Sequence, residues 1–128
     1  MNHRELEDLV VRFTDAFNRD DLDAVMSFFA DDAVYDEWNG VQSRGVAAIR
    51  AAFAPQFAGA FGKIRFASED LFVDPVSGKA LIRWLCTLER DGRVRGWRGL
   101  DILHVVERRI TEKLTYAKAE RLALDELP

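Results

Sequence analysis

The sequence predicts a single α+β domain, in which helices come first along the chain and an antiparallel sheet follows. Apolar residues recur at helical spacing in the first half, whereas in the second half they alternate with polar residues, with turn signals between the alternating runs. A chain of 128 residues has room for one domain and for a core that is stable without cross-links. Helices and strands that are segregated along so short a chain indicate the α+β class.

The first helix is expected to bury the face formed by Leu6, Leu9, Val10, Phe13 and Phe17. These positions follow the period of an α-helix. Asp20 or Asp21 is positioned to cap a second helix, because a short carboxylate side chain can accept a hydrogen bond from the first-turn amides. This second helix is expected to carry Leu22, Val25, Met26 and Phe29 and to stop near residues 31–32.

Residues 33–37 are typical of a short strand, which the turn signal Asn39-Gly40 ends. Ser43 is the predicted cap of a third helix that runs through Val46, Ile49 and Phe53. Pro55 should disturb this helix, since proline has no amide hydrogen to donate.

The second half of the chain is expected to form a curved antiparallel sheet. Alternation that begins at Ile64 is broken at residues 71–73, which indicates a bulge between Ala67 and Asp70. After a turn at residues 74–78, strands are predicted at 79–90, 93–107 and 110–117, the first two joined by the hairpin signal Asp91-Gly92. Residues 1–119 would make the domain, and the polar residues 120–128 a weakly ordered tail.

Charge and composition exclude several classes of protein. The net charge is −4, with lysine and arginine spread along the chain, so nucleic-acid binding is not expected. No apolar run is long enough to cross a membrane, and the first residues lack a signal peptide, so we expect neither membrane association nor export. The lone cysteine, Cys86, cannot form an internal disulfide, which makes the cytoplasm the expected compartment.

No cofactor or metal is expected, because His3 and His104 are not spaced as metal ligands. Nine phenylalanines, three tryptophans and two tyrosines are many for a chain of this size. They fit either an apolar cavity for a small hydrophobic molecule or a well-filled core, and composition does not separate the two.

Residues 29–37, Phe-Ala-Asp-Asp-Ala-Val-Tyr-Asp-Glu, and 44–50, Arg-Gly-Val-Ala-Ala-Ile-Arg, resemble the nuclear transport factor 2-like superfamily, in particular its ketosteroid isomerase and SnoaL-type polyketide cyclase branch. Residues 17–23 and Gly99-Leu100-Asp101 also fit, so the resemblance covers nearly the whole chain. It implies a cone, in which a curved sheet wraps around a long helix and leaves a pocket at one end. It also implies a homodimer formed through the outer face of the sheet.

The resemblance further implies an acid–base site. Glu37 matches the general base that moves a proton beside a ketone, and Asp101 matches a protonated acid that donates a hydrogen bond to the enolate oxygen. Phe13 stands where the family has a tyrosine that completes the oxyanion hole. The loss of one such donor costs about 10²–10³ in rate, so steroid isomerisation in its familiar form is not expected.

Strand parity selects the other residues that would reach the pocket. Asp101 shares a face with Trp97 and Leu103, and on the preceding strand one face carries Ile82, Trp84, Cys86 and Leu88. On the last strand we favour Lys113 inward over Glu112, although the charged corner before it leaves the register open by one residue. The predicted catalytic residues are Glu37, Asp101 and Lys113, and the predicted substrate-binding residues are Phe13, Phe53, Ile82, Trp84, Cys86, Leu88, Trp97 and Leu103.

Each catalytic candidate has a structural alternative. Glu37 could be a solvated charge at a strand end, and Asp101 could form a buried ion pair with Lys113. An acid role needs Asp101 to stay protonated beside an ionised Glu37, whereas contact with Lys113 would leave Asp101 charged and make Lys113 the candidate oxyanion donor.

Two functions from different classes follow. The first is a cofactor-independent acid–base enzyme, of the isomerase or cyclase-like lyase type, that acts on a small hydrophobic carbonyl compound. The second is a binding protein of the same fold without catalysis. In either case a homodimer would bury the outer-face residues Leu85, Leu100 and Ile102, with Arg83, Thr87 and Arg98 at its rim.

Overall fold

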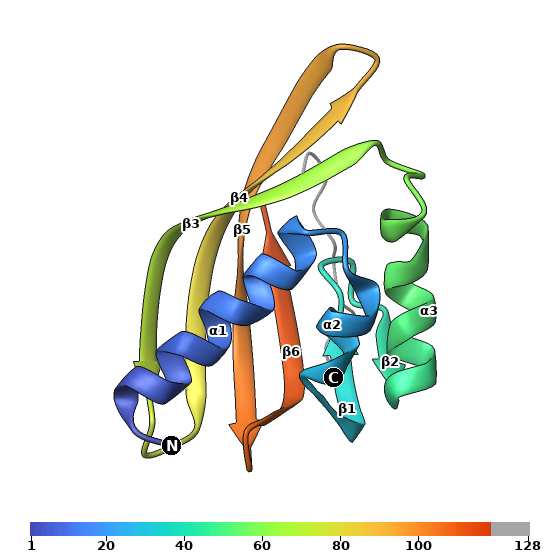
Figure 1. Ribbon diagram of the computed structural model, residues 1–128. Helices are drawn as coiled ribbons and strands as arrows, with labels where there is room; N and C mark the ends of the chain where they lie inside the picture. Colours follow the sequence, from blue (N-terminus) through green and yellow to red (C-terminus); the bar gives the residue numbers. More distant parts are fainter. Residues whose placement is uncertain (119–128) are drawn as a thin grey trace, which may run out of the picture.

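The computed structural model describes residues 1–118 and places the helices mainly before the strands, as the sequence predicts (Figure 1). The helices are α1 (His3–Asn18), α2 (Leu22–Ser27) and α3 (Val46–Phe57). The strands are β1 (Phe29–Asp36), β2 (Gln42–Arg44), β3 (Lys63–Asp74), β4 (Lys79–Arg90), β5 (Arg93–Val106) and β6 (Arg109–Ala117). The predicted tail, residues 120–128, lies outside the described residues. Within residues 1–118 no helix is long and apolar enough to cross a membrane.

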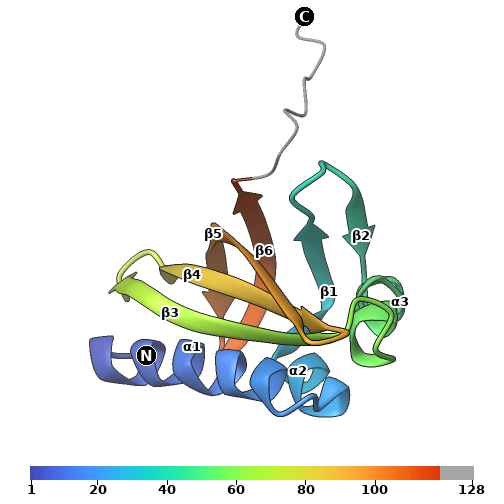
Figure 2. The same ribbon diagram turned by 90° about the horizontal axis from the view of Figure 1, so that it is seen from above.

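All strands belong to one sheet with the order β2-β1-β6-β5-β4-β3. Its pairs are antiparallel except β1 and β6, which run parallel, a pairing that the sequence does not reveal. The sheet curves around α1, and α3 lies at the edge near β1 and β2 (Figures 1 and 2). This α+β architecture with a curved sheet confirms the predicted fold class.

Helix α1 begins and ends at specific side-chain contacts. The Asn2 side chain accepts a hydrogen bond from the Glu5 amide at 2.8 Å, and the Glu5 carboxylate accepts one from the Asn2 amide, which makes a capping box. At the other end, the Asn18 side chain exchanges two hydrogen bonds of 2.8 Å with the backbone of Phe66 on β3. These contacts fix the predicted apolar face of α1, which is buried, against the sheet.

Helix α2 is shorter than predicted. Its cap is Asp21, whose carboxylate accepts a hydrogen bond from the Ala24 amide at 3.0 Å. The helix ends at Ser27, and Phe29 opens β1 instead of continuing the helical face, because it pairs with Ile110 of β6. The Ile110 amide also donates to the Phe28 carbonyl at 2.8 Å. A pairing between residues so far apart in sequence overrides the local helical period.

One prediction about α3 was wrong. Ser43 is not its cap but lies in the short edge strand β2, opposite Tyr35, and α3 instead follows Gly45, whose φ of 83° only glycine adopts easily. Pro55 lies inside α3, which continues to Phe57. The missing amide falls in the last turn of the helix, where the loss of one hydrogen bond does not end it.

The predicted irregularity in β3 is confirmed by a register shift between Ser68 and Asp70. The β4–β5 hairpin lies where the sequence predicts it. The following corner has two residues, as the predicted strand bounds imply, but it lies one residue earlier, since β5 ends at Val106 and β6 begins at Arg109. Its two residues, Glu107 and Arg108, have φ values of 50° and 64°, in the left-handed region.

The outer face of the sheet carries the residues that parity assigns to it. Leu85, Leu100 and Ile102 are half-buried there, and Phe72 on the same face is 57% exposed. Register places Phe72 opposite Leu81, which in turn lies opposite Ile102, so apolar side chains form a continuous row across β3, β4 and β5. An isologous dimer through this row stays a prediction.

For this dimer we expect sedimentation at micromolar concentration to give about twice the chain mass of 14.6 kDa. Leu100→Asp should yield the monomer, because a charge in the centre of an apolar interface is desolvated without a partner. Val76→Asp, at a turn position that is 97% exposed, is the matched control and should leave the mass unchanged. A monomeric wild-type chain would contradict the prediction.

Candidate functional site

The candidate site is centred on an ion pair inside the curve of the sheet. Lys113 Nζ lies 3.0 Å from Asp101 Oδ1, and the two side chains are only 6% and 10% exposed. In the β5–β6 register Lys113 lies opposite Leu103 and Asp101 opposite Thr115, so both charged side chains share the inner face. Lys113, rather than Glu112, therefore points inward.

The hydrogen bonds around Asp101 fit an ionised carboxylate. Oδ1 accepts hydrogen bonds from Lys113 Nζ and from the Thr115 hydroxyl at 2.6 Å, and Oδ2 accepts one from the Trp84 indole at 3.1 Å. Lys113 also donates to Thr115 Oγ1 at 2.7 Å, so the hydroxyl proton is left for Asp101. Because its neighbours in this cluster donate, Asp101 needs no proton of its own, and the arrangement is the buried ion pair rather than a neutral acid.

The surroundings of Lys113 keep its side chain protonated. Burial alone would lower the pKa of Lys113, but Asp101, Tyr35 and Glu37 together outweigh it, and the pKa lies above its usual range. Lys113 is thus an ammonium at neutral pH. Its contribution to stability is present below the unfolded pKa and is lost only as the pH rises through the raised folded value.

Two aromatic rings lie beside the ammonium. Lys113 Nζ is 4.5 Å from the ring centroid of Tyr35 and 5.8 Å from that of Phe53, and the two rings stack with centroids 4.8 Å apart. Tyr35 and Lys113 are direct partners across the parallel β1–β6 pair. Burial raises the pKa of the Tyr35 phenol, as do Asp101 and Glu37, whereas the charge of Lys113 and hydrogen bonding with Thr115 lower it.

Tyr35 and Thr115 are site residues that sequence reasoning missed. The signal was present, since Tyr35 has the parity of Glu37 on one strand and Thr115 has the parity of Lys113 on another. The predicted strand, residues 33–37, is too short for alternation to define a face. The strand begins four residues earlier than predicted, at Phe29.

Glu37 follows β1 at the rim of this cluster. Its side chain is half-buried, and burial raises the pKa of its carboxyl, an effect that the charge of Lys113 partly offsets. Within residues 1–118 the carboxylate takes part in no ion pair or hydrogen bond, although its backbone amide donates to the Val41 carbonyl at 2.9 Å. Glu37 is therefore a half-buried carboxylate on a hydrogen-bonded backbone, and it is free to accept a proton.

The structure places most of the predicted substrate-binding residues in the hydrophobic core. Phe13, Phe53, Ile82, Trp84, Cys86 and Leu103 are buried, and Leu88 and Trp97 are partly buried against them. The ring of Phe13 meets three phenylalanine rings edge-on, those of Phe17, Phe28 and Phe29. Burial raises the pKa of Cys86 to about 12, which makes its thiol unreactive at neutral pH.

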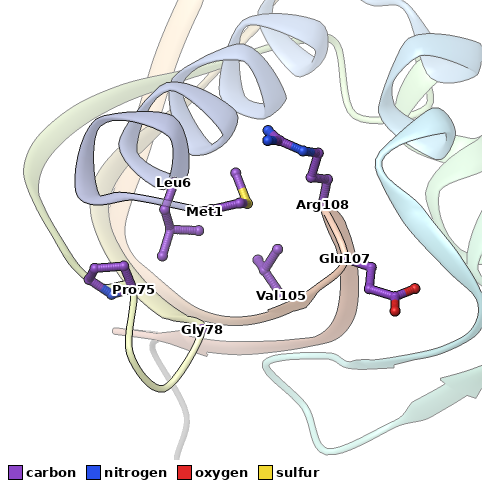
Figure 3. Close-up of a pocket in the computed structure, with 7 residues that line it drawn as sticks. All are labelled: Met1, Leu6, Pro75, Gly78, Val105, Glu107 and Arg108. Atoms are coloured by element: carbon purple, nitrogen blue, oxygen red, sulfur yellow. The ribbon is translucent and has the colours of Figure 1, made fainter.

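Two surface cavities lie away from the ion pair. One, of about 180 Å³, lies beside the first turn of α1 and is lined by Met1, Leu6, Pro75, Gly78, Val105, Glu107 and Arg108 (Figure 3). The other, of about 620 Å³, lies between α2, α3 and the first residues of β1 and β6. Neither includes Glu37, Asp101 or Lys113. Within residues 1–118 no three His, Cys, Asp or Glu side chains gather as metal ligands.

Comparison with known proteins identifies the family. The sequence profile of the SnoaL-like domain matches residues 10–113, which is most of the chain. This chain belongs to the SnoaL-like domain family. The resemblance that the sequence showed is thereby confirmed for the family. No curated protein matches this SnoaL-like chain in sequence.

Solved structures share the fold at low identity. A candidate polyketide cyclase from Xanthomonas campestris pv. campestris is 23% identical, with a TM-score of 0.72 over 91% of this chain and 92% of that one. An NTF2-like protein of unknown function from Mesorhizobium loti is 23% identical, with a TM-score of 0.75 over 91% and 93%. A candidate SnoaL-like polyketide cyclase from Jannaschia is 12% identical, with a TM-score of 0.77 over 91% and 87%. At these identities the likeness shows the fold alone.

We expect Lys113→Met to destabilise this SnoaL-like protein by about 3–5 kcal/mol in urea unfolding, because it leaves the Asp101 carboxylate buried without a counter-charge. Lys113→Met combined with Asp101→Asn should cost less than the sum of the single changes, since the amide oxygen can accept from Trp84 while the amide NH2 donates to the Thr115 oxygen that Lys113 no longer occupies. A loss well below this range in Lys113→Met, or a double-variant loss equal to the sum of the single losses, would contradict this account of the pair.

Glu37→Gln should make the fold more stable at neutral pH. The folded-state pKa of Glu37 is raised, so folding favours its protonated form, and ionisation costs stability above the unfolded pKa. Glutamine mimics the neutral acid, and its gain in unfolding free energy should vanish as the pH falls below about 4. The control is Glu89→Gln at an exposed strand position. An equal gain in both variants, or a loss in Glu37→Gln, would contradict the prediction.

Proposed function

We propose that this SnoaL-like protein is a cofactor-independent acid–base enzyme that acts on a small hydrophobic carbonyl compound. The observation that carries the proposal is a free, half-buried carboxylate, Glu37, beside the fixed ammonium of Lys113. The candidate polyketide cyclases with the same fold add support, since cyclisation of a polyketide is carbonyl chemistry. The buried lone cysteine is in keeping with action in the reducing cytoplasm.

The first step would be removal of a proton from the carbon next to the carbonyl. Glu37 takes this proton, the C–H electron pair moves into the adjacent C–C bond, and the carbonyl π pair moves onto oxygen to give an enolate. A base with a raised pKa takes up a proton more readily than an ordinary carboxylate does. The positive charge of Lys113 stabilises the developing oxyanion in a site of low dielectric.

Two outcomes are open to the enolate. Glu37 can return the proton to a different carbon, which is an isomerisation. Alternatively, the enolate carbon forms a bond to a second carbonyl carbon, the π pair of that carbonyl moves onto its oxygen, and this oxygen takes the proton from Glu37, which is a cyclisation. Both share the first step, and Asp101 takes part in neither as an acid. It holds Lys113 at 3.0 Å and so positions the charge.

The alternative is a small-molecule-binding protein of the same fold without catalysis. It is favoured by the hydrogen bonds of Asp101, Trp84 and Thr115, which are made within the cluster rather than toward an opening. It is also favoured by Phe13, which has no hydrogen to donate. The two functions differ in whether Glu37 moves a proton.

Exchange of carbon-bound hydrogen in D2O, followed by NMR, tests the first step without knowledge of the natural product. We expect the wild type to accelerate exchange in a panel of 1,3-diketones, β-keto esters and β,γ-unsaturated ketones. Glu37→Gln should slow this exchange by about 10²–10⁴, the usual contribution of a general base, and should leave binding of the same compounds almost unchanged. The rate should fall as the pH drops through the raised pKa of Glu37, because the base is then protonated.

Glu89→Gln is the matched control and should exchange at the wild-type rate. Binding of the panel without accelerated exchange would favour the binding protein. Exchange that is equal in the wild type and in Glu37→Gln would contradict the assignment of the base.

A further inference from the structure

We infer that the hydroxyl of Tyr35 donates the direct hydrogen bond to the oxyanion, and that Lys113 acts through Tyr35 as a positioning residue. The inference rests on the proposed function, and it adds a catalytic residue that lies on β1, two residues before the base. It follows from how the donors of the cluster are used.

The ammonium of Lys113 has three hydrogens, and its surroundings occupy them. Two are donated to oxygens, one to Asp101 Oδ1 at 3.0 Å and one to Thr115 Oγ1 at 2.7 Å. The remaining side of the ammonium faces the Tyr35 ring, 4.5 Å from its centroid. A carbonyl oxygen could reach Nζ only by displacing one of these contacts, so Lys113 acts on the reaction by charge.

The other donors of the cluster are also engaged. The Thr115 hydroxyl donates to Asp101 at 2.6 Å, and the Trp84 indole donates to the second oxygen of the same carboxylate at 3.1 Å. Within residues 1–118 the Tyr35 hydroxyl makes no hydrogen bond of 3.5 Å or less, although the Thr115 hydroxyl is near enough to lower the pKa of the phenol. Tyr35 is therefore the least engaged donor of the cluster and the one that a ligand can use.

Strand geometry places this donor beside the base. The hydrogen bond from the Glu37 amide to the Val41 carbonyl at 2.9 Å continues the β1–β2 hairpin past the end of β1, so Glu37 keeps the strand conformation. Residues two apart on a strand lie on one face, about 6–7 Å apart. A carbonyl group between the two side chains would have its oxygen at Tyr35 and its neighbouring carbon at Glu37.

The surroundings of the ring suit this role. Burial raises the pKa of the phenol, so Tyr35 keeps its proton at neutral pH, while the nearby charge of Lys113 makes that proton more acidic than burial alone would. The stack on Phe53, with centroids 4.8 Å apart, fixes the plane of the ring. The proton stays on Tyr35 throughout, since the hydrogen bond stabilises the enolate oxygen and Glu37 carries the transferred proton.

Tyr35→Phe tests the inference because it removes only the hydroxyl and keeps both ring contacts. We expect the kcat of exchange to fall by about 10²–10³ with KM nearly unchanged. The negative charge on oxygen develops only in the transition state, so the lost hydrogen bond affects substrate binding little. The acid limb of the pH profile, which belongs to Glu37, should stay in place. The chain has one other tyrosine, Tyr116, which is 58% exposed on the outer face, and Tyr116→Phe should leave the rate unchanged.

The role of Lys113 is tested by a readout other than activity. In Tyr116→Phe a single tyrosine remains, so ¹³C NMR of ζ-labelled tyrosine follows the Tyr35 phenol alone. Lys113→Met with Asp101→Asn removes the pair without an unpaired charge, and it should raise the pKa of Tyr35 because the ammonium acts on the phenol more strongly than the carboxylate does. An unchanged titration would overturn the role of Lys113.

The outcomes of the exchange experiment are distinct. Exchange that survives in Tyr35→Phe but is lost in Glu37→Gln would overturn the inference and leave the proposed function standing. Loss in both variants, with wild-type stability and an unchanged acid limb in Tyr35→Phe, would support both. No exchange by the wild type would overturn both, because no oxyanion would then form.

Discussion

The buried pair of Lys113 and Asp101 is the interaction on which the interior of this protein depends. Two charges removed from water cost several kcal/mol each, and the pair is tolerable only because its oxygens and hydrogens find partners in Thr115 and Trp84. All four residues come from the three adjacent strands β4, β5 and β6, so their meeting requires one register. Two features set it together: the corner at Glu107 and Arg108, with two non-glycine residues in left-handed conformation, and the register shift beside it between His104 and Val105. A slip of one residue would turn Glu112 inward, toward the carboxylate of Asp101, and would leave Lys113 outside.

Much of the sheet could be predicted because the signals are local. Alternation with period two assigned Ile82, Trp84 and Cys86 to the inner face, and the break at residues 71–73 located the irregularity in β3. The errors occur where a distant partner decides. Phe29 continues the helical period of α2, yet its pairing with Ile110 makes it a strand residue. Ser43 looks like a helix cap, yet it pairs with β1 as part of an edge strand. This strand is too short for alternation to reveal it.

The candidate site was predictable to the same degree and for the same reasons. Glu37 and Asp101 could be named from a resemblance in short motifs, but the state of Asp101 depends on Lys113, which lies beyond a corner of unknown geometry. The place of Tyr35 beside Lys113 could not be predicted, because it results from the parallel pairing of β1 with β6. No sequence pattern indicates this pairing. The aromatic residues suggested a cavity. In the structure many of them pack against one another instead, as in the stack of Tyr35 on Phe53 and the cluster around Phe13.

The cluster around Phe13 also explains why a hydrogen-bond donor would come from the strand rather than from the helix. Three phenylalanine rings lie with centroids 5.2–5.6 Å from that of Phe13, from α1, from the residue after α2 and from β1. A hydroxyl added there would be surrounded by apolar rings, and an unsatisfied buried hydroxyl costs about 1–3 kcal/mol. Tyr35 lies instead beside one ammonium and two carboxylates, which already make this part of the interior polar. In this chain α1 supplies apolar packing around residue 13, and the donor that we propose, Tyr35, lies on β1.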